Sequence, residues 1–334
     1  MRYELCFVLV IISLPLLSHA EPPGTFRWAT GAPFLKAASF ENPEWIAIKD
    51  PSIVQFEGKW HLFCTLRGHE RSHAIVYSSF TDFSEAKTIT PIVLPNHDGY
   101  FCAPQVFWYS PDQKWYLVCQ AKNSDWTPEY QAAYATTEDL VDPNSWSALK
   151  PMKISRPKDD ERSPYLDFWI IRDVERVFNF FTSDNGKMWR CETTVDAFPL
   201  GWDEPVLAYE GDIFEASHIY RLADGRFANL IEAQAPADRR FFKILYANTL
   251  DADWQPRADD EETYASKDNI EFEGETWANS ISHGELIRGG FDERMDTTLD
   301  SPFVFQGVLI KDRRGKDYGD IPWELGLLQP KSLD

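Results

Sequence analysis

The sequence predicts an all-β fold, a single five-bladed β-propeller. A loose repeat occurs five times along the chain: a polar or acidic opening, an apolar strand, a turn and a second strand rich in aromatic residues. Segments with the 3.6-residue period of an amphipathic helix are almost absent, whereas Val, Ile, Phe, Tyr and Trp dominate the apolar segments, as in half-buried strands. A β-sandwich with long irregular loops is the alternative that this pattern leaves open.

The repeats follow one another at intervals that suit propeller blades. They read KDPSIVQFEGKWHLFCT, CAPQVFWYSPDQKWYLVCQ, YLDFWIIRDVERVFNFFTSDNGKMWRCET, FEASHIYRLADGRFANLIEAQ and SHGELIRGGFDERMDTTLDSPFVFQG. We take as matching positions Asp50, Pro104, Asp167, Glu215 and His283. The intervals of 48 to 68 residues between them fit blades of ~40–50 residues with insertions. The turns EGK, PDQ, DNG and ADG supply the Gly, Asn and Asp that hairpins need.

The first 20 residues have the pattern of a secretory signal peptide. Arg2 precedes an apolar run, and the segment ends in SHA, a small-x-small pattern read by signal peptidase. The apolar run is too short to span a membrane, and Pro15 interrupts it. We therefore expect residues 1–20 to be removed, residues 21–334 to form the propeller, and the mature protein to be soluble and secreted.

The net charge of the chain limits the kinds of molecule that it can bind. The formal net charge is −20 at pH 7. Because such a surface repels phosphate backbones and anionic lipid, we expect no nucleic acid and no membrane among the partners. A neutral or cationic substrate fits this charge better.

Four cysteines remain after the predicted cleavage, namely Cys64, Cys102, Cys119 and Cys191. An even number in an oxidising compartment allows up to two disulfides, and all three pairings stay open. None of the spacings resembles a zinc site.

The starts of the predicted strands carry the residues of chemical interest. In a propeller the innermost strand of each blade begins near the axis, so equivalent strand starts converge around one pocket. The residues brought together in this way are Asp50, Asp167, Glu215 and His283, with Gln105 beside the second-blade position. Crowding and burial of three carboxyl groups raise the pKa of at least one of them. Such a set can divide the general-acid and general-base roles of glycoside hydrolysis, although each acid taken singly could equally be a turn-capping or solvated carboxylate.

Six segments, taken in order, resemble the signature segments of the glycoside hydrolase family 62 α-L-arabinofuranosidases. They are KDPSIV, CAPQVFWYSPDQKWYLV, YLDFWII, DNGKMWRCET, FEASHIY and ISHGELIRGGFD, and the resemblance extends from about Phe26 to Pro330. It implies a five-bladed propeller that removes arabinofuranosyl side groups from arabinoxylan or arabinoxylo-oligosaccharides with inversion. We expect a monomer without an organic cofactor.

The resemblance also implies roles for individual residues. Asp50 would be the general base, Glu215 the proton donor, and Asp167 the group that adjusts the donor's pKa and orients the sugar. His283 would lie on the axis and meet a calcium ion or water. Lys49 would bind the furanose or keep Asp50 ionised.

Two further substrate contacts are expected at Gln105 and Trp323. Trp323 stands where the family usually has a tyrosine that seats the xylan backbone, and Ala121 stands where many members have a tryptophan. The polymer preference therefore stays open. A related propeller enzyme acting on arabinan and a non-catalytic carbohydrate-binding propeller are the alternative functions.

Overall fold

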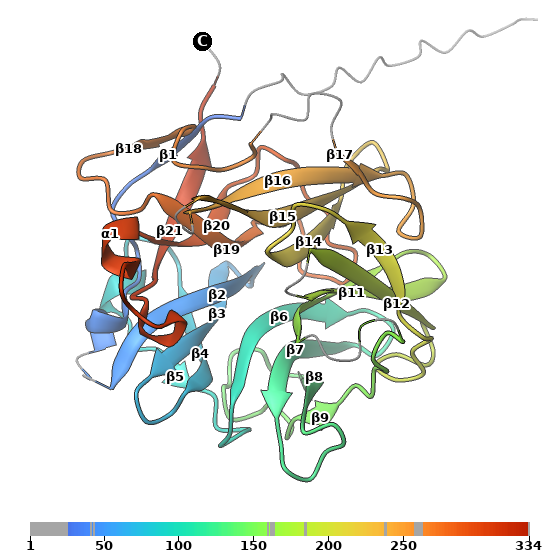
Figure 1. The fold of residues 1–334 in the computed structure, drawn as a ribbon. Coiled ribbons are helices and arrows are strands. Elements are labelled where there is room, and N and C mark those ends of the chain that lie inside the picture. Colours follow the sequence, from blue (N-terminus) through green and yellow to red (C-terminus); the bar gives the residue numbers. More distant parts are fainter. Residues whose placement is uncertain are drawn as a thin grey trace, which may run out of the picture.

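The strands form five sheets around one axis, as expected for a five-bladed propeller (Figure 1). Four sheets have four strands and the fifth has five. The predicted fold is thus confirmed, and the β-sandwich alternative is wrong. The computed structural model describes residues 26–332 apart from 41, 43, 159, 161–163, 184–185, 237–238 and 257–262. The predicted signal peptide lies outside the described residues.

Each of the first four blades is an antiparallel meander that runs from the axis outward. Blade one contains β2 (Trp45–Phe56), β3 (Lys59–Gly68), β4 (His73–Phe80) and β5 (Ile92–Val93). Blade two contains β6 (Phe101–Tyr109), β7 (Lys114–Lys122), β8 (Tyr130–Thr137) and β9 (Lys150–Pro151). Blade three contains β10 (Tyr165–Arg172), β11 (Arg176–Ser183), β12 (Lys187–Thr194) and β13 (Val206–Glu210). Blade four contains β14 (Glu215–Arg221), β15 (Phe227–Ala235), β16 (Arg239–Ala247) and β17 (Gln255–Pro256).

Blade five joins the two ends of the described chain. Its strands are β19 (Ser280–Leu286), β20 (Phe303–Val308), β21 (Glu324–Pro330), β1 (Trp28–Thr30) and β18 (Ile270–Phe272). The first strand, β1, pairs antiparallel with the last strand, β21, and parallel with β18. The ring is therefore closed by hydrogen bonds between the chain ends.

The helical segments of the described residues are short: η1 (Ala37–Phe40), η2 (Ala86–Thr88), α1 (Ile310–Arg313) and η4 (Tyr318–Asp320). Both α1 and η4 belong to the connection between β20 and β21. No helix in the described part of the chain is long and apolar enough to cross a membrane.

Each innermost strand carries a β-bulge at the same level of the axis. In the first four blades the bulged residue has a positive φ, which non-glycine residues rarely adopt: Asp50 (50°), Ala103 (50°), Asp167 (57°) and Ala216 (52°). The matching positions in the second and fourth blades are thus Ala103 and Ala216, one residue away from Pro104 and Glu215. The sequence repeat misplaced them by one residue because these strands are buried on both faces, so no alternation of apolar and polar residues marks the bulged position.

The backbone N–H groups at these bulges donate to side chains of the preceding blade. A bulge leaves its N–H outside the strand ladder, and a buried N–H without an acceptor is costly. The donors and acceptors are Asp50 with Gln306, Ala103 with Thr65, Ala216 with Asp167, and His283 with Glu232, at 2.8 to 3.0 Å. Polar side chains therefore join neighbouring blades around the axis.

The connection between β19 and β20 closes one end of the axis. Its backbone pairs with Trp108, Arg172 and Arg221, which lie at the far ends of β6, β10 and β14. The buried carboxylate of Glu293 in this connection accepts from the Arg172 guanidinium at 2.7 Å. The acids predicted from the sequence lie at the opposite ends of the inner strands, so the pocket opens on one face.

The state of the four cysteines differs from the expectation of up to two disulfides. All four are buried free thiols, so neither of the two disulfides that the sequence allowed is formed. Cys64 and Cys119 lie in different apolar clusters, and burial raises the pKa of both thiols. Each therefore packs as a small apolar side chain.

The Glu293–Arg172 pair provides a test of the closed end of the axis. We expect Glu293→Ala to lower the free energy of unfolding by about 3 kcal/mol, because it leaves a largely buried guanidinium without its partner. Urea denaturation measures this change. Glu175→Ala, at an exposed turn, is the control and should change stability by less than about 0.5 kcal/mol. Equal stability of the two variants would contradict the assigned role of Glu293.

Candidate active site

The structure brings the three predicted acids and His283 together at the axis. Asp50 and Asp167 occupy the bulges of β2 and β10, Glu215 is the first residue of β14, and His283 lies in β19. The Nδ1 atom of His283 is 3.7 Å from Oδ1 of Asp50 and 3.7 Å from Oδ1 of Asp167. Asp50 and Asp167 are buried, whereas 17% of the Glu215 side chain is exposed. Glu215 is thus the acid that solvent reaches most easily.

Asp50 is held in its ionised form. Burial by itself raises its pKa, but the charges of Lys49 and His283 and a hydrogen bond from Thr65 outweigh burial, so the pKa of Asp50 is lowered. The Nζ atom of Lys49 lies 3.6 Å from Oδ2 of Asp50. Burial by itself lowers the pKa of Lys49, but Asp50 and the other acidic groups nearby outweigh it, so the pKa of Lys49 is raised. The predicted contact between Lys49 and Asp50 is therefore present.

Glu215 and Asp167 are shifted in the opposite direction. Burial raises the pKa of Glu215, the Arg240 charge opposes this, and the Asp167 charge adds to it, with a raised pKa as the net result. Burial likewise raises the pKa of Asp167. The charge of His283 lowers this pKa, whereas the charge of Asp50 raises it further, and the net shift is upward. The surroundings thus separate the pKa values of Asp50 and Glu215, as a base and an acid in one site require.

The sequence analysis did not identify two charged residues of the site, Arg240 and Glu232. Arg240 on β16 is only 1% exposed, and its Nη1 atom lies 3.2 Å from Glu215 Oε2 and 3.0 Å from Glu232 Oε1. Glu232, on β15, is fully buried and also accepts from the Ser282 hydroxyl at 2.9 Å. The sequence signal was an acid inside the apolar run NLIEAQ, a place where a solvated carboxylate is unusual.

An exposed aromatic residue, Tyr318, borders the pocket from the side of blade five. It lies in η4, and 45% of it is exposed. Lys49 Nζ lies 5.2 Å and Arg240 Cζ 5.3 Å from the centroid of its ring. The segment DYGD gave the available signal, since an aromatic residue in a polar, glycine-containing loop is often placed for contact with a ligand.

Comparison with known proteins now decides the family. Residues 30–329 match the sequence model of Glycosyl hydrolase family 62. The chain belongs to this family.

Known members resemble the chain over nearly all of its length. Alpha-L-arabinofuranosidase C of Cellvibrio japonicus is 35% identical over 323 residues, which are 93% of this chain and 48% of that protein. The chain thus spans about half the length of that relative. The α-L-arabinofuranosidase of Podospora anserina, solved with cellotriose, is 33% identical with a TM-score of 0.85 and covers 93% of this chain and 98% of its own. A family 62 hydrolase solved with xylotriose is 33% identical with a TM-score of 0.82, covering 91% and 97%.

In this family 62 chain the Gln105 side chain bonds the backbone of the neighbouring blade and does not face the candidate active site. It is buried, and both ends of its amide are used between blades two and three. Its Nε2 donates to the carbonyl of Ile170 at 2.8 Å, and its Oε1 accepts from the N–H of Ile170 at 2.7 Å. The predicted substrate contact of Gln105 is corrected accordingly, because no donor or acceptor of the amide faces the pocket.

Trp323 also differs from its prediction. It is 1% exposed and packs among Ala47, Val308 and Ile321. The guanidinium groups of Arg240 and Arg313 lie 5.6 Å from its ring centroid and cover it. The Trp323 ring therefore packs against the guanidinium groups of two arginines and is not open to a substrate. The exposed aromatic residue near the pocket is Tyr318.

The predicted calcium ion has no ready-made cage in the family 62 site. Among the described residues, no three His, Cys, Asp or Glu side chains are arranged to hold a metal ion. Calcium prefers about six to eight oxygen ligands, whereas His283 presents a nitrogen to two carboxylates whose charge it balances. Burial by itself lowers the pKa of His283, but the two carboxylates outweigh it, so the pKa of His283 is raised.

Arg240 offers a test of the electrostatics of the site. Its charge lowers the pKa of Glu215, so Arg240→Gln should move that pKa further upward. Carbon-13 NMR titration of the glutamate carboxyl groups measures this, with the Glu215 signal assigned by Glu215→Gln. Arg239→Gln removes the neighbouring cation on the same strand and should leave the titration unchanged. A Glu215 pKa that stays or falls in Arg240→Gln would contradict the arrangement.

Proposed function

We propose that this chain is an α-L-arabinofuranosidase that removes arabinofuranosyl side groups from arabinoxylan by inverting hydrolysis. The observation that carries the proposal is the pairing, in one pocket, of an acid with a lowered pKa, Asp50, and one with a raised pKa, Glu215. Family membership supports the same activity, and the xylotriose bound to a relative supports a xylan-type backbone.

The proposed reaction is a single displacement. Glu215, protonated, donates its proton to the glycosidic oxygen, so the bond to the anomeric carbon breaks and the xylan hydroxyl leaves. Asp50 takes a proton from a water molecule, whose oxygen forms the new bond to the anomeric carbon on the opposite face. Inverting enzymes keep the two carboxyl groups ~6.5–9.5 Å apart to admit this water, and base and acid come here from different blades.

The other charged groups support these two roles. Asp167 Oδ2 accepts from the N–H of Ala216 at 3.0 Å, so it fixes the backbone next to the proton donor. Its charge also raises the pKa of Glu215, which keeps the donor protonated. Lys49 and His283 keep Asp50 ionised. After proton transfer, Arg240 stabilises the carboxylate of Glu215, because its Nη1 is already within 3.2 Å.

Secretion, monomeric state and a structural calcium ion form part of the same proposal. The apolar N-terminal run that ends in SHA supports export. The calcium ion rests on the family resemblance alone, because the described side chains around His283 do not form a calcium cage. Calorimetric titration with calcium and sedimentation of the pure protein test the last two points.

Digestion of arabinoxylan provides the first test of the activity. Proton NMR should show arabinose released as its β-anomer before mutarotation, with the xylan backbone intact. Linear and branched arabinan are the comparison substrates and should be cut far more slowly. Release of the α-anomer would contradict inversion, and faster release from arabinan would contradict the substrate.

Replacement of the proton donor provides the second test. Glu215→Gln keeps the shape of the side chain but cannot donate a proton, so we expect kcat to fall by about 10³-fold while oligosaccharide binding is retained. Asp212→Asn, at an exposed acid three residues earlier, is the control and should retain activity. Wild-type release by Glu215→Gln would show that Glu215 is not the acid.

The pH profile of kcat/KM provides the third test. The rate should rise as Asp50 ionises, below the usual value of ~3.9, and fall as Glu215 loses its proton, above the usual value of ~4.3. Because Lys49 lowers the pKa of both acids, Lys49→Met should move both limbs to higher pH. Lys59→Met, at an exposed turn, is the control. Limbs that stay in place or move down in Lys49→Met would contradict these assignments.

A further inference from the structure

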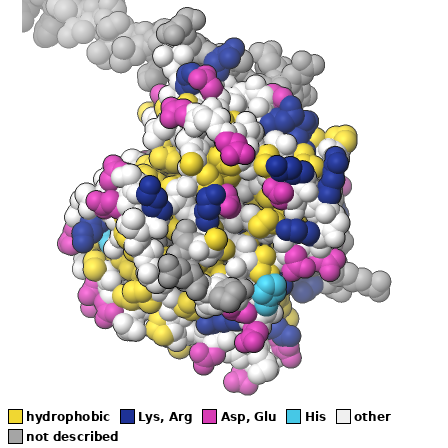
Figure 2. Space-filling model, turned by 90° about the vertical axis from the view of Figure 1, so that its left-hand side faces the viewer, with side chains coloured by type: hydrophobic (Ala, Val, Ile, Leu, Met, Phe, Trp, Pro, Cys, Tyr) yellow, Lys and Arg dark blue, Asp and Glu magenta, His cyan; other side chains and the backbone are white. Residues whose placement is uncertain are grey.

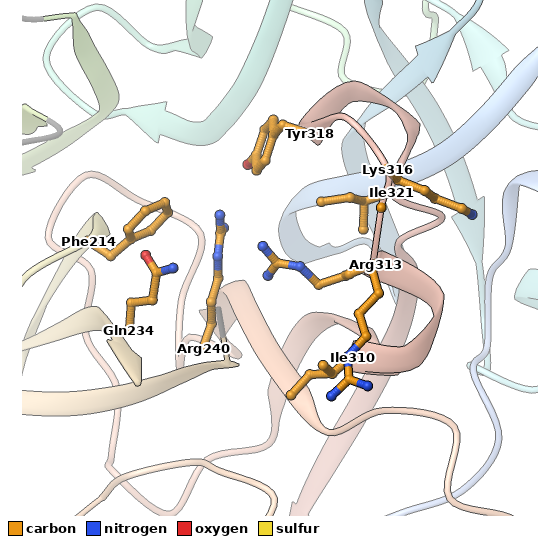
Figure 3. A pocket seen from close by; sticks show the side chains of 10 residues that line it. Phe214, Gln234, Arg240, Ile310, Arg313, Lys316, Tyr318 and Ile321 are labelled. Carbon is orange, nitrogen blue, oxygen red and sulfur yellow. The ribbon is translucent and has the colours of Figure 1, made fainter. Parts of the chain in front are cut away.

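A cavity lies beside Glu215, between blade four and the connection from β20 to β21, and it shares Arg240 and Tyr318 with the candidate active site (Figure 3). Its volume is about 470 Å³. Blade four and the segment before β14 contribute Phe214, Gln234 and Arg240, and the connection contributes Ile310, Arg313, Arg314, Gly315, Lys316, Tyr318 and Ile321. A cavity of this size accommodates a sugar ring with its substituents.

The lining of the cavity is cationic although the protein is strongly acidic. Four of its residues carry a positive charge, namely Arg240, Arg313, Arg314 and Lys316, and none of the described residues that line it is acidic. The chain as a whole carries a formal charge of −20. On the face of the molecule that carries α1, Lys and Arg side chains are interspersed with Asp and Glu side chains, so the positive charge is confined to the cavity and does not cover the face (Figure 2). Glu215 and Glu232 balance the charge of Arg240, so the cations of the connection, Arg313, Arg314 and Lys316, make the cavity a local positive region that attracts an anion.

Two of the positive side chains meet in the cavity. Figure 3 shows the guanidinium of Arg313 directed toward that of Arg240, which itself extends toward Tyr318, whereas Lys316 points away from both arginines. Arg240 is 1% exposed, and both guanidinium groups stack on the buried Trp323, which holds them in place. Phe214 and Tyr318 add aromatic faces, which suit the C–H faces of sugars. The cavity thus combines fixed positive charge with surfaces for a pyranose ring.

Arg240 connects the cavity to the proton donor. Its Nη1 lies 3.2 Å from Glu215 Oε2, so the cavity begins within one arginine side chain of the glycosidic oxygen that Glu215 would protonate. A group bound there must belong to a part of the polymer close to the xylose that carries the arabinosyl group.

We propose that this cavity binds the carboxylate of a uronic acid side group on the xylan chain, so that the enzyme prefers acidic arabinoxylan over neutral arabinoxylan. The inference rests on the proposed arabinofuranosidase activity and adds a substrate class to it. A planar carboxylate fits the fork of a guanidinium, and the hexose-sized ring fills the volume that a small inorganic anion leaves empty.

Matched oligosaccharides test the proposal. The acidic substrates carry one arabinosyl group and one uronic acid, on the xylose to either side, and the neutral counterparts have the uronic carboxyl reduced to an alcohol. We expect kcat/KM to be about tenfold higher for at least one acidic isomer, through a lower KM. This preference should shrink at high salt because the site is partly exposed.

Variants of the cations contributed by the connection separate the cavity from the catalytic groups. Arg313→Gln combined with Lys316→Gln should remove most of the preference and leave the rate on the neutral substrate unchanged. Lys311→Gln removes a cation of α1 that does not line the cavity, and it should keep the preference.

The outcomes distinguish this inference from the proposed function. Arabinose release at equal rates from acidic and neutral substrates, or a preference that survives in the double variant, would overturn the uronic acid site and leave the arabinofuranosidase activity standing. Absence of release from both substrates would overturn the proposed function itself.

Discussion

The constraint on which the structure depends is the hydrogen bonding of the bulges around the axis. Each inner strand must bend there, and the N–H that bending frees needs an acceptor in a dry interior. In four of the five blades the described structure supplies that acceptor from the side chain of the preceding blade. Two residues further along the inner strands of the first four blades, a second set of side chains contacts the backbone of the next blade: Ser52, Gln105, Trp169 and His218. The blades are thus linked by two belts of polar contacts.

The site is built from members of the first belt, so fold and chemistry share atoms. Asp167 accepts the bulge N–H of Ala216 and at the same time faces His283. Glu232 accepts the bulge N–H of His283 and pairs with Arg240. The strained φ of Asp50 persists because its N–H donates to Gln306, as is common where strain serves a site. The pocket therefore holds its charges without relying on mobile loops.

Charge balance in this pocket explains why its acids titrate so differently. The carboxyl groups of Asp50, Asp167, Glu215 and Glu232 face the cations Lys49, His283 and Arg240. Buried groups tolerate little net charge, so one acid more than the cations implies at least one bound proton. Asp50 has two cations beside it and loses its proton, whereas Glu215 shares Arg240 with Glu232 and keeps its own. The sequence predicted the acids through their recurrence at strand starts, but not Arg240 and Glu232, because their pairing across strands leaves no periodic signal. Gln105 and Trp323 were misjudged for a related reason, since burial depends on neighbours far away in the chain.

Arg240 links the acids of the candidate active site to the cationic cavity. Its positive charge opposes protonation of Glu215, and the same guanidinium faces the cationic cavity. An anion bound there would offset part of this charge, and the pKa of Glu215 would rise because less positive potential remains at its carboxyl group. Anion binding in the cavity and protonation of Glu215 would therefore be coupled through a single side chain, with a sign that favours the protonated form of Glu215 when the cavity is occupied. A neutral substrate would leave the charge of Arg240 shared between Glu215 and Glu232 and would lack this contribution.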